Sequence, residues 1–300
     1  TAGRASEPLW FGVATWRWMF LSLLVPALAY GLLALTIPES PRYLVAKRDL
    51  AQAAHVLRRF VGGDVDERIR EIDRTLVGRS DHTGFATIRG PRFGLLPIVW
   101  VGIGLSVFQQ FTGINVIFYY STVLWRAVGF SEQDALLITV ITAVTNIVTT
   151  VIAIALIDRI GRKPLLLIGS IGQFACLGVL AVLFGTAPVV NGQPDLIGAA
   201  GPIALIAANL YVVFFGATWG PVVWVLLGEM FNNKIRAMAL AVGAAAQWAA
   251  NFLISTTFPA LAAVGLSLAY GIYTVFALLS IFFVIKFIRE TKGRELEDMV

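Results

Sequence analysis

The most constraining feature of the sequence is a run of 33 residues, Phe93 to Trp125, that contains no charged side chain. The hydrocarbon core of a bilayer is ~30 Å thick and needs about 20 helical residues to cross, so this run is long enough to span it. Uncharged amides are costly at mid-membrane depth unless each finds a partner. The run therefore predicts a membrane helix with a site for a neutral, hydroxyl-rich solute, because it carries Gln109, Gln110, Thr112, Asn115, Tyr119 and Tyr120.

Composition places the whole chain among membrane proteins. It is 58% hydrophobic and 14% charged, with a mean hydropathy of +0.79, whereas charged residues make up about a quarter of a soluble domain. A secretory signal would be one short apolar stretch near the start, but apolar stretches recur to the end of this chain. The single cysteine, Cys176, excludes a disulfide framework within the chain.

Apolar length and turn signals predict an all-α membrane protein with seven transmembrane helices. Most spans end at a proline, a charge run or an Asn-Asn pair. The expected spans are Trp16–Ile37, Leu95–Val123, Asp134–Ile157, Leu165–Gly185, Pro202–Leu227, Ala237–Pro259 and Leu266–Phe287.

Lysine and arginine are distributed unevenly among the connections. Twenty of the 23 fall in residues 42–92, 158–164 and 229–236 and in the tail from residue 286. The positive-inside tendency makes this side cytoplasmic, so we expect an external N-terminus and a cytoplasmic C-terminus. The net charge of +5 then favours loops beside anionic lipid over nucleic-acid binding. Because an odd span count with an external start is unusual and the first residue is Thr1, we interpret the chain as the C-terminal part of a longer protein.

One long polar insertion separates the first two spans. Residues 51–60 and 66–76 have helical apolar spacing with charged outer faces, which predicts short amphipathic helices under the membrane domain. Gly62 and Gly63 separate them. His55 and His82 are interpreted as surface imidazoles.

Several short motifs follow one another in a fixed order, and together they resemble the sugar porter family of the major facilitator superfamily. The resemblance covers about residues 16–300 and implies the last seven of twelve helices, with an N-terminal half that is missing here. It implies an N-terminal segment and span at 1–41, an intracellular helical region at 42–94, a six-helix half at 95–288 and a tail at 289–300. The motifs are Pro38-Glu-Ser-Pro-Arg42, Gln109-Gln-Phe-Thr-Gly-Ile-Asn115 with Tyr119-Tyr120, Asp158-Arg-Ile-Gly-Arg-Lys163, Gly220-Pro221 to Trp224, Gly228-Glu-Met230 and Glu290-Thr-Lys-Gly293.

A polar stripe on the second span is the centre of the expected site. On an ideal helix Gln109, Thr112, Asn115 and Tyr119 fall within an arc of roughly 120°, and Gly113 can loosen the helix so that Gln110 turns inward. Amides donate and accept hydrogen bonds, as sugar hydroxyls do. The alternative is that these amides only hold helices together. The resemblance implies sugar contacts at Gln109, Gln110, Asn115, Tyr119, Asn146, Trp224, Gln247 and Trp248.

The resemblance also implies a gate. Gly220-Pro221 interrupts helical hydrogen bonding and should permit a bend. Ion pairs between inner helix ends would hold the gate shut; the alternative is that these charges only set topology. Two positions depart from the family pattern: Gly216 stands where some members carry an acidic residue, and Arg289 where a proline is usual. The charges expected to form the gate's ion pairs are Asp158, Arg159, Arg162, Glu229 and Arg236.

These features favour transport of a monosaccharide or polyol by alternating access. No HExxH, G-x-S-x-G, P-loop or Cys/His metal spacing occurs, so we expect no enzyme, catalytic residue, metal or cofactor. Ionisable residues are absent from the middle of every span, so a coupling acid would belong to the missing part, and proton symport and facilitated diffusion both stay open. Other readings are a carrier of another neutral or organic-acid solute, a sugar sensor, or an inactive fragment. The lack of an N-x-S/T sequence favours a bacterial inner membrane.

Overall fold

The structure is a computed structural model that describes residues 7–77, 84–91, 93–127, 129–190, 193–232 and 235–292. Its contacts divide the chain into two compact units, with the division between residues 83 and 84. The domain limits expected at residues 41, 94 and 288 stay a prediction. Seven helices among the described residues are long and apolar enough to cross a membrane, in agreement with the sequence.

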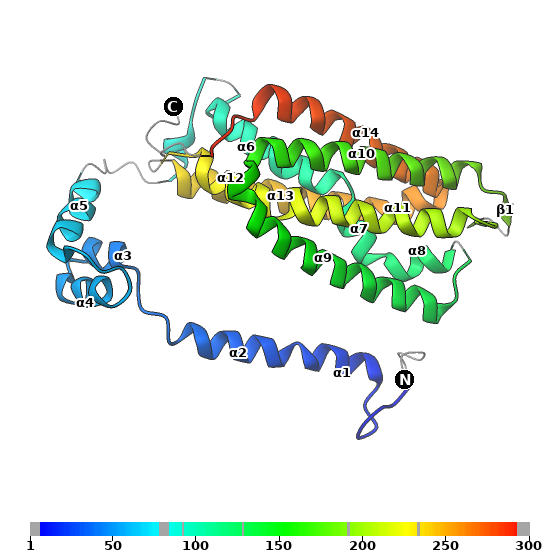
Figure 1. Ribbon diagram of the computed structural model, residues 1–300, viewed down its shortest axis with the longest axis horizontal. Helices are drawn as coiled ribbons and strands as arrows, with labels where there is room; N and C mark the ends of the chain where they lie inside the picture. The colour runs from blue at the N-terminus through cyan, green and yellow to red at the C-terminus, as the bar shows by residue number, and fades with distance from the viewer. Residues whose placement is uncertain are drawn as a thin grey trace. The chain divides into compact units, whose positions relative to one another are not determined.

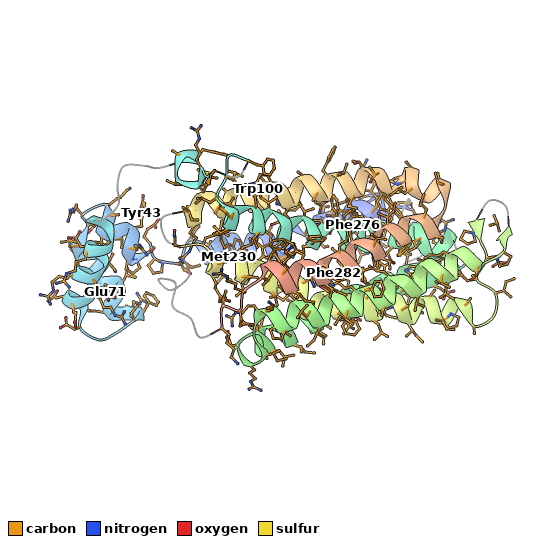
Figure 2. All side chains as sticks on the ribbon, turned by 90° about the horizontal axis from the view of Figure 1, so that it is seen from above. Tyr43, Glu71, Trp100, Met230, Phe276 and Phe282 are labelled. Carbon is orange, nitrogen blue, oxygen red and sulfur yellow. The ribbon has the colours of Figure 1, made fainter. Side chains whose placement is uncertain are left out.

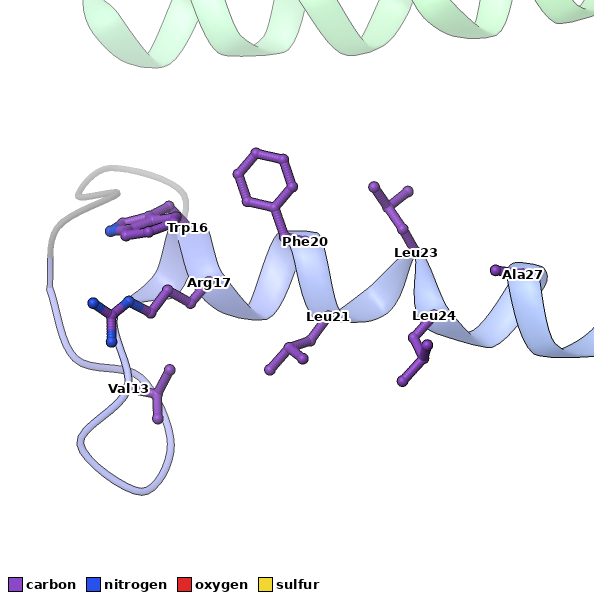
Figure 3. A pocket seen from close by; sticks show the side chains of 8 residues that line it. All are labelled: Val13, Trp16, Arg17, Phe20, Leu21, Leu23, Leu24 and Ala27. Atoms are coloured by element: carbon purple, nitrogen blue, oxygen red, sulfur yellow. The ribbon is translucent and has the colours of Figure 1, made fainter.

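The first unit begins with an apolar helix that buries none of its residues and contacts the segment before it through the rings of Trp18 and Trp10. α1 (Thr15–Ser22) and α2 (Leu24–Ala34) form an almost continuous span, and none of their residues is buried. A shallow groove of about 610 Å³ runs along them, lined almost wholly by apolar side chains. Trp16 and Phe20 point to one side of the helix and Leu21 and Leu24 to the other (Figure 3). Side chains of this kind suit contact with lipid, and the groove has no amide or hydroxyl side chain that would hold a polar solute.

The rest of the first unit is a small helical cluster. It consists of α3 (Pro41–Ala46), α4 (Leu50–Phe60) and α5 (Val65–Val77). The Asp49 carboxylate accepts a hydrogen bond from the backbone N–H of Gln52 at 3.1 Å and so caps α4. α4 and α5 confirm the two amphipathic helices expected at residues 51–60 and 66–76. His55 is exposed as expected, and His82 lies outside the described residues. The apolar faces meet in a core of Leu44, Val45, Ala53 and Val56, with Ile69 and Ile72 against it.

The second unit is a bundle of long helices that lie side by side (Figure 1). The last span coincides with the expected range, and the others differ from expectation by a few residues at each end. A two-residue antiparallel pair, β1 (Val189–Val190) with β2 (Gln193–Pro194), lies between α10 (Arg162–Thr186) and α11 (Ala200–Phe214). The helices are η1 (Phe85–Ile88), α6 (Pro97–Phe111), α7 (Ile114–Tyr119), α8 (Ser121–Ala127), α9 (Glu132–Ile160), α10 (Arg162–Thr186), α11 (Ala200–Phe214), the π-helical η2 (Phe215–Trp219), α12 (Gly220–Met230), α13 (Arg236–Val264) and α14 (Leu266–Phe287).

Small residues and hydroxyls bring the helices of this bundle close together. Ser280 on α14 donates to the Ser170 hydroxyl on α10 at 2.8 Å, and Ser267 donates to the Ala181 carbonyl at 2.8 Å. α10 and α14 are therefore antiparallel and in contact along their length. Gly172 faces the Phe214 ring so closely that a Cβ atom would collide with it. Such contacts supply the van der Waals packing that holds helices together in lipid.

Candidate functional site

A break in the second span positions its polar side chains. α6 ends at Phe111, and Gly113 has φ 84° and ψ 19°, a left-handed conformation that favours glycine. A Cβ atom on Gly113 would also lie 2.7 Å from the Tyr273 ring. The Tyr211 hydroxyl donates to the Thr112 carbonyl at 2.8 Å and so supplies the hydrogen bond that a carbonyl at a helix end lacks. α7 (Ile114–Tyr119) begins directly after this residue, with Asn115 on its first turn.

The amides of this span meet in one cluster. The Gln110 side-chain carbonyl accepts hydrogen bonds from the Asn115 amide and, at 3.3 Å, from the Asn251 amide on α13. Ser255 donates to the Asn251 carbonyl at 3.3 Å, which fixes the orientation of that amide. Gln110 and Asn251 are buried, and Asn115 is half-buried. α6, α7 and α13 thus each contribute an amide to one point, which we call the amide cluster (Gln110, Asn115 and Asn251).

Gln109 connects this cluster to a widened turn. Its side-chain NH₂ group donates to the carbonyls of Trp219 at 2.9 Å and Gly220 at 3.2 Å, and its carbonyl accepts a long bond from Gln110 at 3.5 Å. The sequence predicts a bend at Gly220-Pro221. The structure places the π-helical turn η2 directly before that pair, so that the irregular turn precedes the proline, whose missing N–H leaves one carbonyl without a helical donor.

Trp219 fixes this turn to the bundle. Its ring is fully buried, and its indole N–H donates to the Leu166 carbonyl and the Ser170 hydroxyl, both at 3.1 Å. Gly216, in the same turn, packs against Thr149 on α9, and a Cβ atom there would collide with the Thr149 hydroxyl. A side chain at this position would therefore require Thr149 to move.

The other expected sugar contacts lie outside the amide cluster. Tyr119, Trp224 and Trp248 are 59%, 44% and 63% exposed, and Asn146 is half-buried. Gln247 is buried, and its side-chain carbonyl oxygen has no hydrogen-bond partner in the described part of the chain. None of these five side chains bonds to the cluster in this structure. Three are aromatic surfaces and two are amides with hydrogen-bonding capacity to spare.

A second polar group lies at the far end of the bundle, where α9, α10 and α12 meet. The Arg162 guanidinium binds both oxygens of Glu229, at 2.6 and 3.0 Å, and one oxygen of Asp158 at 2.9 Å. The Arg162 side chain is only 10% exposed. Among the described residues, Arg159 and Arg236 have no carboxylate within ion-pair distance; Arg236 instead donates to the Phe231 carbonyl at 3.2 Å. The structure thus unites three of the five charges expected to pair.

Glu290 ties the tail to the same group. Its carboxylate accepts the backbone N–H groups of Arg162 and Lys163 at the start of α10, each at 3.0 Å, and those of Thr291 and Lys292. Burial alone would raise the pKa of Glu290, but these four donors stabilise the carboxylate and hold its pKa below the ordinary value of 4.5. A helix N-terminus favours such an anion. The neighbouring Thr291 hydroxyl donates to Glu229 at 2.6 Å.

The sequence predicted Gln109, Gln110 and Asn115 as site residues, but it did not predict most of the residues that the structure places around them. Asn251 carried a signal, because it lies one helical turn after Gln247 on the same face. Tyr211, Tyr273 and Trp219 carried none, since each belongs to another helix and resembles an ordinary core aromatic. Glu290 was part of a recognised motif, but nothing in the sequence paired it with the start of α10.

Comparison with known proteins gives consistent matches along almost the whole chain. The profile of the family described as "Sugar (and other) transporter" matches residues 9–300. A glucose transport protein of Synechocystis sp. is 61% identical over 99% of this chain, and the D-xylose-proton symporter of Escherichia coli is 39% identical over 99%. The chain spans 64% and 59% of the lengths of these two relatives.

Among solved structures, that of the major facilitator superfamily proton:xylose symporter XylE bound to 6-bromo-6-deoxy-D-glucose superimposes with a TM-score of 0.78. The two proteins are 38% identical, and the match covers 97% of this chain and 59% of the other.

Proposed function

Because the chain belongs to the sugar porter family of the major facilitator superfamily, we propose that it takes part in carrying a monosaccharide or polyol across a membrane by alternating access. Family membership and seven apolar helices make it an integral membrane protein. Since the chain spans about two thirds or less of its relatives, the activity is proposed for the protein in its natural full-length form.

The amide cluster is the observation that carries the proposal. Gln110, Asn115 and Asn251 concentrate donors and acceptors inside apolar helices, and Gln247 has a free buried acceptor. A sugar hydroxyl both donates and accepts, so it can replace or extend these bonds. The exposed rings of Trp224 and Trp248 supply flat faces for the C–H side of a sugar ring. The proposed contacts are Gln109, Gln110, Asn115, Tyr119, Asn146, Trp224, Gln247 and Trp248, with Asn251 added.

The charge group at the other end of the bundle is proposed as the inner gate. Arg162 holds Asp158 and Glu229 together in this structure, and Gly220-Pro221 lets α12, which carries Glu229, change its tilt. Fully exposed ion pairs are individually worth only ~0–1 kcal/mol, but the Arg162 side chain is largely buried, and several pairs together bias two states that differ by a few kcal/mol. Arg159 and Arg236 are proposed to form their pairs in another state of the cycle.

The charge distribution gives the proposed setting. The side rich in lysine and arginine, which includes the tail, would face the cytoplasm, and the relatives from Synechocystis and Escherichia coli favour the inner membrane of a bacterium. A proton is a proposed second substrate, since one relative is named a proton symporter.

Uptake of labelled D-glucose and D-xylose into membrane vesicles, with and without a proton gradient, tests the proposal. We expect saturable uptake that Gln110→Ala or Asn115→Ala abolishes without changing the amount of protein in the membrane. Gln52→Ala, which removes an exposed amide of the first unit, is the matched control. Normal uptake by both cluster variants would refute the assigned site. Sugar binding without uptake would instead favour a sensor.

A further inference from the structure

A second groove in the bundle is independent of the amide cluster. It runs between the start of α6 and the end of α14 and has a volume of about 590 Å³. Pro97 lies 13 residues before Gln110 on the same helix, which places the groove about 20 Å from the cluster. Its lining is apolar and mostly aromatic: Phe93, Pro97, Trp100, Val101, Phe283 and Phe287.

The aromatic walls of this groove lie at the ends of two spans. Phe93 is 93% exposed and has φ 50°, a left-handed conformation that is uncommon for a bulky residue. Its ring meets the Trp100 ring edge to face, with the centroids 6.3 Å apart. Trp and other aromatic side chains at span ends are typical of the membrane–water interface. Among the described residues the Phe93 ring has almost no cover, and a lipid chain beside it would supply one.

The groove continues into a more polar one of about 500 Å³. The two share Pro97, Val101 and Phe287, and the second reaches Lys286 and Arg289. Trp100 of the first and Met230 of the second lie at the same end of the bundle (Figure 2). Because the two grooves share a wall, we treat them as one channel that is apolar on the side of the spans and basic at the end of α14, where Lys286 lies in the last turn and Arg289 just after it.

The basic groups at this rim have no acidic partner in the part of the chain that the structure describes. The Lys286 ammonium lies 5.5 Å from the centroid of the Phe287 ring, and both Lys286 and Arg289 are exposed. Neither has a carboxylate within ion-pair distance among the described residues. Glu290 also lines the polar groove, but its carboxylate accepts four backbone N–H groups. Among the described residues the rim therefore presents unpaired positive charge at the end of an apolar span, where lipid headgroups are expected.

We propose that this channel binds one anionic phospholipid, with an acyl chain along Trp100 and Phe283 and the phosphate between Lys286 and Arg289. The apolar and basic sections follow one another in the order of a phospholipid's tail and headgroup. The lipid would also touch Thr291 and Glu290, which bind Glu229 and the start of α10, and so would stabilise the tail against the charge group.

Native mass spectrometry of the full-length protein in a neutral detergent tests this site. Phosphatidylglycerol and phosphatidylcholine with the same acyl chains are titrated separately, and glycerol 3-phosphate serves as the headgroup without a tail. We expect one phosphatidylglycerol to bind first, phosphatidylcholine to bind at least tenfold more weakly, and glycerol 3-phosphate not to bind. One basic residue near an anionic surface contributes about 1 kcal/mol, or about fivefold in affinity.

One variant tests the basic section of the channel, with a matched control, and another tests the apolar section. Lys286→Gln with Arg289→Gln should weaken phosphatidylglycerol about 25-fold, whereas Arg58→Gln with Arg59→Gln, which removes the same charge from an exposed part of α4, should not. Trp100→Ala should weaken both lipids.

Equal binding of the two lipids, or equal effects of the two double variants, would overturn the proposal. Binding of glycerol 3-phosphate as tight as that of the lipid would make the rim a site for free phosphate. Phosphatidylglycerol binding that appears only after removal of residues 293–300 would show that the chain's own end occupies the channel.

Discussion

The Tyr211 hydroxyl on α11 donates a 2.8 Å hydrogen bond to the carbonyl oxygen of Thr112, at the point where α6 stops. Tyr211 is fully buried, and so is Thr112. One phenol thus pairs the carbonyl that the helix break leaves without an amide donor, and it does so three residues before Asn115. The conformation that brings Asn115 to Gln110 therefore depends on a residue from another helix.

Tyr211→Phe should lower the free energy of unfolding by about 1–3 kcal/mol, because it leaves a buried carbonyl unpaired. It should also weaken sugar binding, since the amide cluster loses its fixed backbone. Tyr270→Phe is the matched control: the Tyr270 hydroxyl is buried without a hydrogen-bond partner among the described residues, so its removal should cost no stability. Thermal unfolding and equilibrium sugar binding measure the two effects, and equal stability of both variants would contradict the role of the Thr112 bond.

Gly113→Ala should disrupt the site by two routes. A left-handed conformation costs a residue with a Cβ atom about 1–2 kcal/mol, and the added atom would lie 2.7 Å from the Tyr273 ring. We expect a lower melting temperature and loss of saturable uptake. Gly271→Ala, whose Cβ would meet no atom within 4 Å, should leave both unchanged. A fully active Gly113→Ala protein would show that the break is not needed.

Gln247→Leu should weaken sugar binding by about 2- to 10-fold, the equivalent of one hydrogen bond of about 0.5–1.5 kcal/mol. The side-chain carbonyl of Gln247 is buried without a hydrogen-bond partner in the described residues, so its loss should not lower the free energy of unfolding. Gln173→Leu removes another buried amide, on α10, that also has no partner in the described residues, and it should leave sugar affinity unchanged. Isothermal titration with the transported sugar distinguishes the two, and the same affinity in both variants would remove Gln247 from the site.

Arg162→Lys should impair transport more than sugar binding. A lysine is a single point charge and cannot bind both oxygens of Glu229 while it also contacts Asp158. We expect a sugar dissociation constant within about twofold of the wild type, on the premise that the amide cluster lies far from this charge, and a clearly altered uptake rate. Arg58→Lys, which makes the same exchange at an exposed position on α4, should transport normally. Identical rates for the two variants would argue against a gate at Arg162.

The contribution of Glu290 to stability should depend on pH in one direction. Because the pKa of Glu290 is lower in the folded protein than its ordinary value of 4.5, the carboxylate stabilises the fold fully above that value and loses its effect as pH falls through the folded pKa. The difference in melting temperature between the wild type and Glu290→Gln should be constant from pH 7 to about pH 5.5 and shrink below pH 4.5. A difference that grows on acidification would reverse the assignment.

Much of the architecture followed from apolar length. The last span, 266–287, was predicted to the residue, because a glycine and a charged tail mark its ends. Helical periodicity predicted Gln109 and Asn115 on one face of an unbroken span, whereas the helix breaks after Phe111 and Asn115 bonds to Gln110. Periodicity gives the direction in which a side chain points but not the residue it meets, since the partner comes from a distant part of the chain. Tyr211, Tyr273 and the donors to Glu290 were therefore beyond sequence reasoning, and so was the π-helical turn before Pro221.

The attachment of Trp219 fixes the pivot of α12. The indole is held by Leu166 and Ser170, and Gln109 holds the carbonyls of Trp219 and Gly220, so any swing of α12 starts just after them. Glu229 lies nine residues farther along, on a lever of about 13 Å. A rotation of only about 10° would displace its carboxylate by about 2 Å, enough to separate it from Arg162, while the amides at the fulcrum hardly move.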